Sequence, residues 1–208
     1  MESGWMGRTL SIESVAGHPD FRALRDIAGI RVDLRYASRD NFVGDDMYSP
    51  FDCGWLHRDA ARSLEKAAAF LAARRPEASL LVLDALRPQR VQERMWAALE
   101  GTGLTQYLAH PERGSIHSFG MAVDVTIVDA SERELDMGTG FDDLTERSHP
   151  ALEEGFLARG DLTDLHVENR RLLRAVMNEA GWRGINTEWW HFDGGERDRI
   201  RAGYVRVL

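Results

Sequence analysis

Cysteine and lysine are nearly absent from the 208-residue chain. Cys53 is the only cysteine and Lys66 the only lysine among 26 lysine and arginine residues, so arginine supplies almost all of the positive charge. One cysteine excludes an intrachain disulfide framework and a zinc site built on thiolates. Lys66 has no glycine-rich approach and therefore does not belong to a Walker A phosphate-binding loop. Any chemistry must be carried mainly by histidine, carboxylate and arginine side chains.

The sequence also lacks a long apolar run and an excess of positive charge. No stretch approaches the ~20 apolar residues that cross a bilayer, and residues 1–8 lack the apolar core of a signal peptide. The net charge of −8 disfavours a nucleic-acid-binding groove. A hydrophobic fraction of 43% is enough for a sizeable core. We therefore expect one cytoplasmic domain over residues 1–208, with an irregular flank at 1–30, that binds neither nucleic acid nor membrane.

Hydrophobic periodicity predicts helices and strands that alternate irregularly and are joined by long loops. Helices are expected at residues 59–74, 89–100 and 164–180. Strands are expected at 31–37, 80–83, 121–128 and 187–192. Long loops are expected at 38–55, 101–114 and 129–162. The irregular alternation favours an α+β fold over a doubly wound sheet.

Two short segments concentrate residues that can bind a metal. The first runs from Ser115 to Asp124 and contains His117 and Gly120, and the second runs from Glu188 to His191. Two histidines and a carboxylate form a catalytic zinc site without any cysteine, with one position left for water. A further carboxylate that is not a ligand can then act as general base.

Spacing alone leaves a metal site and a structural role both open. A strand aspartate is commonly solvated, and a histidine beside tryptophan is commonly a packed core residue. Glu188 and His191 are three residues apart, so a regular strand would point them to opposite faces of a sheet. A bulge or bend between them is required if both are to face one metal.

The combined pattern resembles a known family. Ser-x-His-x-x-Gly-x-Ala-x-Asp at residues 115–124, followed by Glu-x-Trp-His at 188–191, is similar to the zinc D-Ala-D-Ala peptidases related to the hedgehog fold. The branch it resembles most closely is the D-alanyl-D-alanine dipeptidases of the vancomycin-resistance type. Further similar segments lie, in order, at residues 36–42, 84–90, 137–142, 146–149 and 169–174.

The resemblance implies one Zn²⁺ per chain, with His117, Asp124 and His191 as its ligands. It implies that Glu188 is the general acid/base. It further implies that Arg87 stabilises the oxyanion of the tetrahedral intermediate. The implied fold is a small central antiparallel sheet with flanking helices and long loops.

The implied substrate is a small dipeptide, and the implied reaction is hydrolysis of D-alanyl-D-alanine to two D-alanines. Ser115 and Tyr36 would help to hold the charged ends of the substrate, and Asp142 would pair with its ammonium group. Two alternatives stay open: a zinc D,D-carboxypeptidase or L-Ala-D-Glu peptidase of peptidoglycan, and a non-catalytic zinc-bearing interaction domain. The sequence fixes no oligomeric state.

Overall fold

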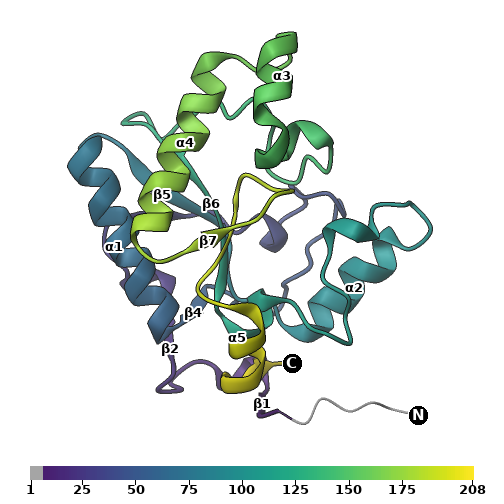
Figure 1. Ribbon diagram of the computed structural model, residues 1–208. Helices are drawn as coiled ribbons and strands as arrows, with labels where there is room; N and C mark the ends of the chain where they lie inside the picture. The colour runs from purple at the N-terminus through teal and green to yellow at the C-terminus, as the bar shows by residue number, and fades with distance from the viewer. Residues whose placement is uncertain (1–6) are drawn as a thin grey trace.

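Helices and strands are interspersed along the chain in the computed structural model, which describes residues 7–208 (Figure 1). The helices in this part of the chain are α1 (Arg58–Arg74), α2 (Gln89–Leu99), α3 (Glu153–Arg159), α4 (Asp164–Glu179) and α5 (Arg197–Gly203). The three predicted helices are confirmed as α1, α2 and α4, and the α+β class is confirmed as well. Among the described residues, no helix is both long enough and apolar enough to span a membrane.

A five-stranded sheet lies at the centre of residues 7–208. In spatial order its strands are β3 (Ile30–Val32), β5 (Ser79–Asp84), β6 (Ala122–Val128), β8 (His191–Asp193) and β7 (Arg183–Gly184). The predicted antiparallel arrangement holds for β5–β6, β6–β8 and β7–β8, but it is wrong for β3–β5, which is parallel. The chain returns from β3 to β5 through the long helix α1, and a crossover of that kind places two strands parallel.

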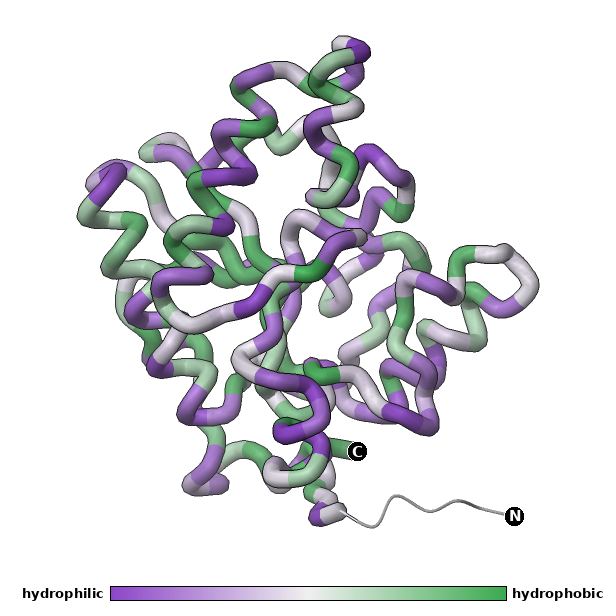
Figure 2. The backbone as a smooth tube through the Cα atoms, in the orientation of Figure 1, coloured by the Kyte–Doolittle hydropathy of each residue, from purple (hydrophilic) through white to green (hydrophobic). Residues whose placement is uncertain are grey.

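Helices α1 and α4 pack their apolar stripes against this sheet (Figure 1). Leu64 and Leu71 of α1, and Leu173 and Val176 of α4, are buried in the same core as the apolar residues of β5 and β6. Figure 2 shows the matching pattern, with hydrophobic central strands and alternating hydrophobic and hydrophilic residues along the helices. This packing fixes β6, the strand on which Asp124 lies.

Two predicted strands are shorter than the sequence suggests. The strand expected at 31–37 ends at Val32, and Tyr36 lies in a 3₁₀ turn at Arg35–Ala37 that buries its ring. The strand expected at 187–192 begins only at His191, because the chain bends at residues 189–190. Both departures bring polar side chains toward the candidate site, where sheet pairing gives way to local turns.

Residues outside the central sheet contain more regular structure than expected. The segment 129–162 includes α3, and the flank expected to be irregular contains β1 (Thr9–Leu10) and β2 (Phe21–Ala23). Strand β2 pairs with β4 (Trp55–His57), and β1 pairs in parallel with β9 (Arg206–Val207), which joins the two ends of the described chain. Residues 1–6 of the predicted flank lie outside the described residues. Elements this short carry too little periodicity to be found from sequence.

Candidate active site

His117 is placed by a short 3₁₀ turn, Ile116–Phe119, that precedes β6. Ser115 caps the turn, and its hydroxyl oxygen accepts the backbone N–H of His117 at 3.3 Å. The turn ends at Gly120, whose φ is +62°, and a Cβ there would lie 2.7 Å from the backbone nitrogen of His57. Only glycine fits this conformation and this close approach. Gly120 thus allows the chain to turn sharply between His117 and the strand that carries Asp124.

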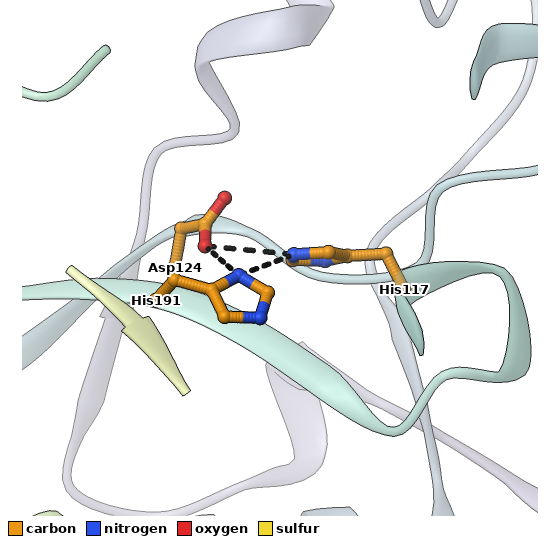
Figure 3. A group of neighbouring side chains, drawn as sticks. All are labelled: His117, Asp124 and His191. Carbon is orange, nitrogen blue, oxygen red and sulfur yellow. Dashed lines mark hydrogen bonds and ion pairs between the residues drawn. The ribbon is translucent and has the colours of Figure 1, made fainter. Parts of the chain in front are cut away.

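Asp124 and His191 are brought together by the register of β6 and β8. They are directly paired across the two antiparallel strands, so their side chains share one face. His191 Nδ1 lies 2.9 Å from Asp124 Oδ1, and His117 Nε2 lies 3.2 Å from His191 Nδ1 and 3.5 Å from Asp124 Oδ1. Figure 3 shows the three atoms pointing toward one another. The three predicted ligands therefore form one buried cluster.

Each histidine has one ring nitrogen that points away from the cluster, and the hydrogen bond of that nitrogen shows that the other ring nitrogen faces the cluster without a hydrogen. His117 Nδ1 lies 2.8 Å from the carbonyl oxygen of Ala85, and His191 Nε2 lies 3.0 Å from Asp193 Oδ1. Both partners are acceptors, so in neutral imidazoles these nitrogens carry the hydrogens. The cluster then consists of two lone pairs and a carboxylate oxygen, which is a donor set for a metal ion.

The spacing and the electrostatics of this cluster both fit a zinc ion. Tetrahedral zinc with bonds of ~2.0–2.1 Å separates its ligand atoms by about 3.3 Å, close to the distances between these side-chain atoms. Burial alone would lower the pKa of His191, but the carboxylates of Asp193 and Asp124 raise it to about 10. Burial opposes ionisation of Asp124, yet His117 and His191 hold its pKa well below the usual range. The protein thus favours positive charge at this point.

Glu188 stands beside the cluster without a partner. Its side chain is buried, lines the same cavity as His117, Asp124 and His191, and makes no hydrogen bond to any residue between 7 and 208. Burial is the main reason that its pKa is raised to about 7, and the negative charge of Asp124 adds to the effect. In a regular strand, Glu188 and His191 would point to opposite faces of the sheet. The chain bends at residues 189–190 and Glu188 lies outside the strand that begins at His191, so both residues line the same cavity.

Arg87 is held rigidly where β5 leads into α2. Its Nε and one terminal nitrogen donate to Asp84 Oδ2 at 3.0 and 2.5 Å, and the other terminal nitrogen donates to Gln92 Oε1 at 3.1 Å. The guanidinium lies over the ring of Tyr36, 5.1 Å from its centroid. It also approaches Asp124 Oδ2 to 3.6 Å, which places it at the edge of the His-Asp-His cluster.

Asp142 and Tyr36 form a separate polar pair in the same cavity. The Tyr36 hydroxyl donates to Asp142 Oδ1 at 2.9 Å, whereas Asp142 Oδ2 is buried and has no hydrogen-bond partner within the described chain. Burial and the negative charge of Asp124 raise the pKa of Asp142 to about 8. A buried carboxylate with one unsatisfied oxygen is suited to receive a cationic group of a ligand.

All eight residues predicted from the sequence line one cavity of about 210 Å³. Sequence reasoning missed the groups that hold them in place: Asp193 and the Ala85 carbonyl behind the histidines, and Asp84 and Gln92 behind Arg87. Asp84 directly follows the strand predicted at 80–83 and ends β5 in the structure, three residues before Arg87, so its position in the sequence could have indicated a contact with Arg87. The contact between Ala85 and His117 spans 32 residues and has no local signature.

A buried His-Asp-His cluster beside an unpartnered glutamate and a preorganised arginine is the arrangement of a metal-dependent hydrolase. Comparison with known proteins specifies the family. Residues 20–206 match the family model for D-Ala-D-Ala dipeptidases, Peptidase M15, and the chain belongs to this family of metallopeptidases.

Individual relatives agree with the family match. The D-alanyl-D-alanine dipeptidase of Escherichia coli is 37% identical over 164 residues, which cover 79% of this chain and 78% of the relative. The D-alanyl-D-alanine dipeptidase of Enterococcus faecium is 33% identical over 186 residues, covering 80% and 86% of the two chains. That of Streptomyces coelicolor is 31% identical over 185 residues, also covering 80% and 86%.

Proposed function

We propose that the chain hydrolyses D-alanyl-D-alanine to two D-alanines, with one Zn²⁺ held by His117, Asp124 and His191. The observation that carries this proposal is the unpartnered Glu188 carboxylate, which lines the same cavity as the three-residue donor set. When bound, zinc supplies a Lewis acid and lowers the pKa of water from 15.7 to about 7. The remaining steps depend on side chains of the protein.

Glu188 is proposed to move the proton. It takes a proton from the attacking water and delivers it to the amide nitrogen that leaves, as a general base followed by a general acid. Its buried position raises its pKa to about 7, so the carboxyl group can both accept and return a proton near neutral pH. No other carboxylate in the cavity combines burial with the absence of hydrogen bonds to the described residues.

Arg87 is proposed to stabilise the negative charge that develops on the carbonyl oxygen. Asp84 and Gln92 hold the guanidinium before any substrate arrives, so little reorganisation is needed during the reaction. Burial would lower the pKa of Arg87, but Asp84 and its other neighbours raise it well above the usual range, and the positive charge is retained. The presence of both Arg87 and Glu188 in the cavity speaks against a non-catalytic role.

The ends of the substrate are proposed to contact the three remaining residues. Asp142, supported by Tyr36, receives the ammonium group through its unsatisfied oxygen. Ser115 accepts a backbone N–H, so its own hydroxyl hydrogen is available to the substrate carboxylate. A cavity of about 210 Å³ is smaller than the pockets of ~300–1,000 Å³ that hold drug-sized ligands, which suits a dipeptide.

The decisive experiment is a turnover assay with three peptides: D-Ala-D-Ala, L-Ala-L-Ala and a tripeptide ending in D-Ala. We expect D-Ala-D-Ala to be hydrolysed, the activity to disappear with a chelator, and added zinc to restore it. Preferential cleavage of the tripeptide would instead assign the chain to the carboxypeptidase alternative. Inactivity of the zinc-loaded protein on all three peptides would contradict the proposal.

A further inference from the structure

Two arginines of α5 line the candidate active-site cavity together with the metal cluster. Arg197 and Arg201 are four residues apart and therefore lie on one face of this short helix. The helix is largely hydrophilic along its length (Figure 2). The proposed reaction gives these two positive charges no role.

Arg201 is held next to Ser115. Its side chain is 11% exposed, and its Nε and one terminal nitrogen lie 3.4 and 3.2 Å from the carbonyl oxygen of Gly114, the residue before Ser115. The other terminal nitrogen lies 3.4 Å from Asp198 Oδ1. A guanidinium has five N–H donors, so these contacts leave donors of Arg201 unused.

Arg197 stands beside the metal cluster. Its Nε donates to Asp193 Oδ2 at 2.6 Å, and Asp193 in turn contacts His191. The terminal nitrogens of Arg197 donate no hydrogen bond to any residue in the described part of the chain. They are available to a ligand in the cavity.

Each arginine has one carboxylate partner, Asp193 for Arg197 and Asp198 for Arg201, and keeps terminal N–H donors beyond that pair. Burial lowers the pKa of Arg201, and the positive charges of Arg113 and Arg197 lower it further, against a smaller opposing effect of Asp198 and Asp193. A partly buried guanidinium in this situation gains from an anion placed between it and its neighbour. Asp142, the proposed ammonium partner, lies between β6 and α3, whereas the two arginines belong to α5, so different segments of the chain supply the opposite charges of the cavity.

We propose that Arg201, together with Arg197, binds the free C-terminal carboxylate of the dipeptide and thereby confines the enzyme to peptides that end at the leaving residue. The inference rests on the proposed dipeptidase function. A planar guanidinium donates two parallel hydrogen bonds to a carboxylate, and an amide cannot accept both. In a longer peptide, that position holds an amide bond in place of the carboxylate. The two arginines would then select substrates that have a free carboxylate directly after the cleaved bond's leaving residue.

The test compares D-Ala-D-Ala with D-alanyl-D-alanine amide, in which an uncharged amide replaces the C-terminal carboxylate, on the zinc-loaded full chain. A hydrogen bond between charged partners contributes enough that its loss costs about 10- to 100-fold in affinity. We expect the wild-type enzyme to favour the free acid by at least about this factor in kcat/KM, chiefly through KM. In Arg201→Gln the preference should shrink markedly, because activity on the acid falls and activity on the amide does not, and the remainder comes from Arg197 and Ser115.

Matched variants separate this role from a structural one. Arg197→Gln should reduce the same preference by a smaller factor, and its more exposed side chain makes misfolding a lesser concern. Arg199→Gln removes the same charge from the same helix at an exposed residue that does not line the cavity, and it should leave the preference unchanged. Zinc content and Tm show whether each variant is folded. If Arg201→Gln does not fold, Arg197→Gln carries the test.

A binding measurement provides a readout that is independent of turnover. Calorimetric titration of D-Ala-D-Ala into the Glu188→Gln protein should give weaker binding when Arg201→Gln is added, whereas the amide should bind both proteins alike. A wild-type enzyme that cleaves acid and amide equally, or an unchanged preference in both cavity variants, would overturn the carboxylate site and leave the dipeptidase function standing. Failure to cleave D-Ala-D-Ala at all would instead defeat the proposed function.

Discussion

Two sides of the cavity differ in how completely their polar atoms are hydrogen-bonded. The metal side consists of His117, Asp124 and His191, the proposed zinc ligands, and the substrate side of the residues proposed to act on the peptide, among them Glu188 and Asp142. On the metal side, paired strands and a capped turn place the histidines, and each remote ring nitrogen has a protein partner. On the substrate side, Glu188 has no hydrogen bond among residues 7–208, and one oxygen of Asp142 is buried without a partner. The metal side is preformed, whereas the substrate side retains unsatisfied groups that a ligand can fill.

The largest effect is expected from Glu188→Gln. This change keeps the size of the side chain and removes the base, so turnover should fall by roughly 10²–10⁴-fold while zinc is retained. In the wild type, activity should fall as pH drops through the pKa of Glu188, because the protonated carboxyl cannot accept a proton. That pKa is raised to about 7 by burial, and bound zinc lowers it, so the acid limb should lie at or below pH 7.

Turnover and zinc content measured on the same Glu188→Gln preparation check this expectation. A variant that remains active would remove Glu188 from the mechanism. Loss of zinc in the variant would show that Glu188 is needed for metal binding. The distinction between the metal side and the substrate side of the cavity would then be wrong for this residue.

Arg87→Lys should have the next largest effect. A lysine keeps the positive charge but cannot contact Asp84 and Gln92 and still present a fixed donor to the substrate. The expected loss is about 10²–10³-fold in kcat, with full zinc occupancy. The check is steady-state kinetics together with metal analysis, and a loss confined to KM would show that Arg87 binds substrate without stabilising the transition state.

Asp193→Asn tests the metal side through a residue that is not a ligand. The amide contacts His191 less favourably than the carboxylate does, so zinc affinity should weaken by roughly 10–100-fold. Competition with a chromogenic chelator measures this affinity. Asp161→Asn, at an exposed residue between α3 and α4, is the matched control. Equal zinc affinity in Asp193→Asn and the wild type would show that the histidine needs no carboxylate support.

Asp142→Asn should have the smallest effect and should act on the substrate side alone. The amide oxygen can still accept the Tyr36 hydroxyl, but the negative charge that faces the ammonium is lost. We expect KM for D-Ala-D-Ala to rise by about 10-fold, with zinc affinity unchanged. Asp143→Asn is the control, since Asp143 pairs weakly with Arg147 and does not line the cavity. A loss of zinc in Asp142→Asn would contradict the separation of the two sides.

Much of the candidate site was predictable because its motifs are compact. His117, Gly120 and Asp124 lie within ten residues of sequence, and helices α1, α2 and α4 follow clear apolar stripes. The short elements α3 and α5 were missed because seven residues span barely two turns and carry little periodicity. The relationship to the hedgehog fold and the cytoplasmic location stay predictions.

By itself, the sequence determined which side-chain types were available and which segments carried them. The near absence of cysteine and lysine left histidine, carboxylate and arginine, and local spacing grouped His117 with Asp124 and Glu188 with His191. Tertiary structure decided the rest, because the decisive contacts join distant segments. The register of β6 and β8 pairs Asp124 with His191, and the Ala85 carbonyl fixes the hydrogen on His117. The fold likewise places α5 beside Ser115, so that Arg197 and Arg201 line the cavity.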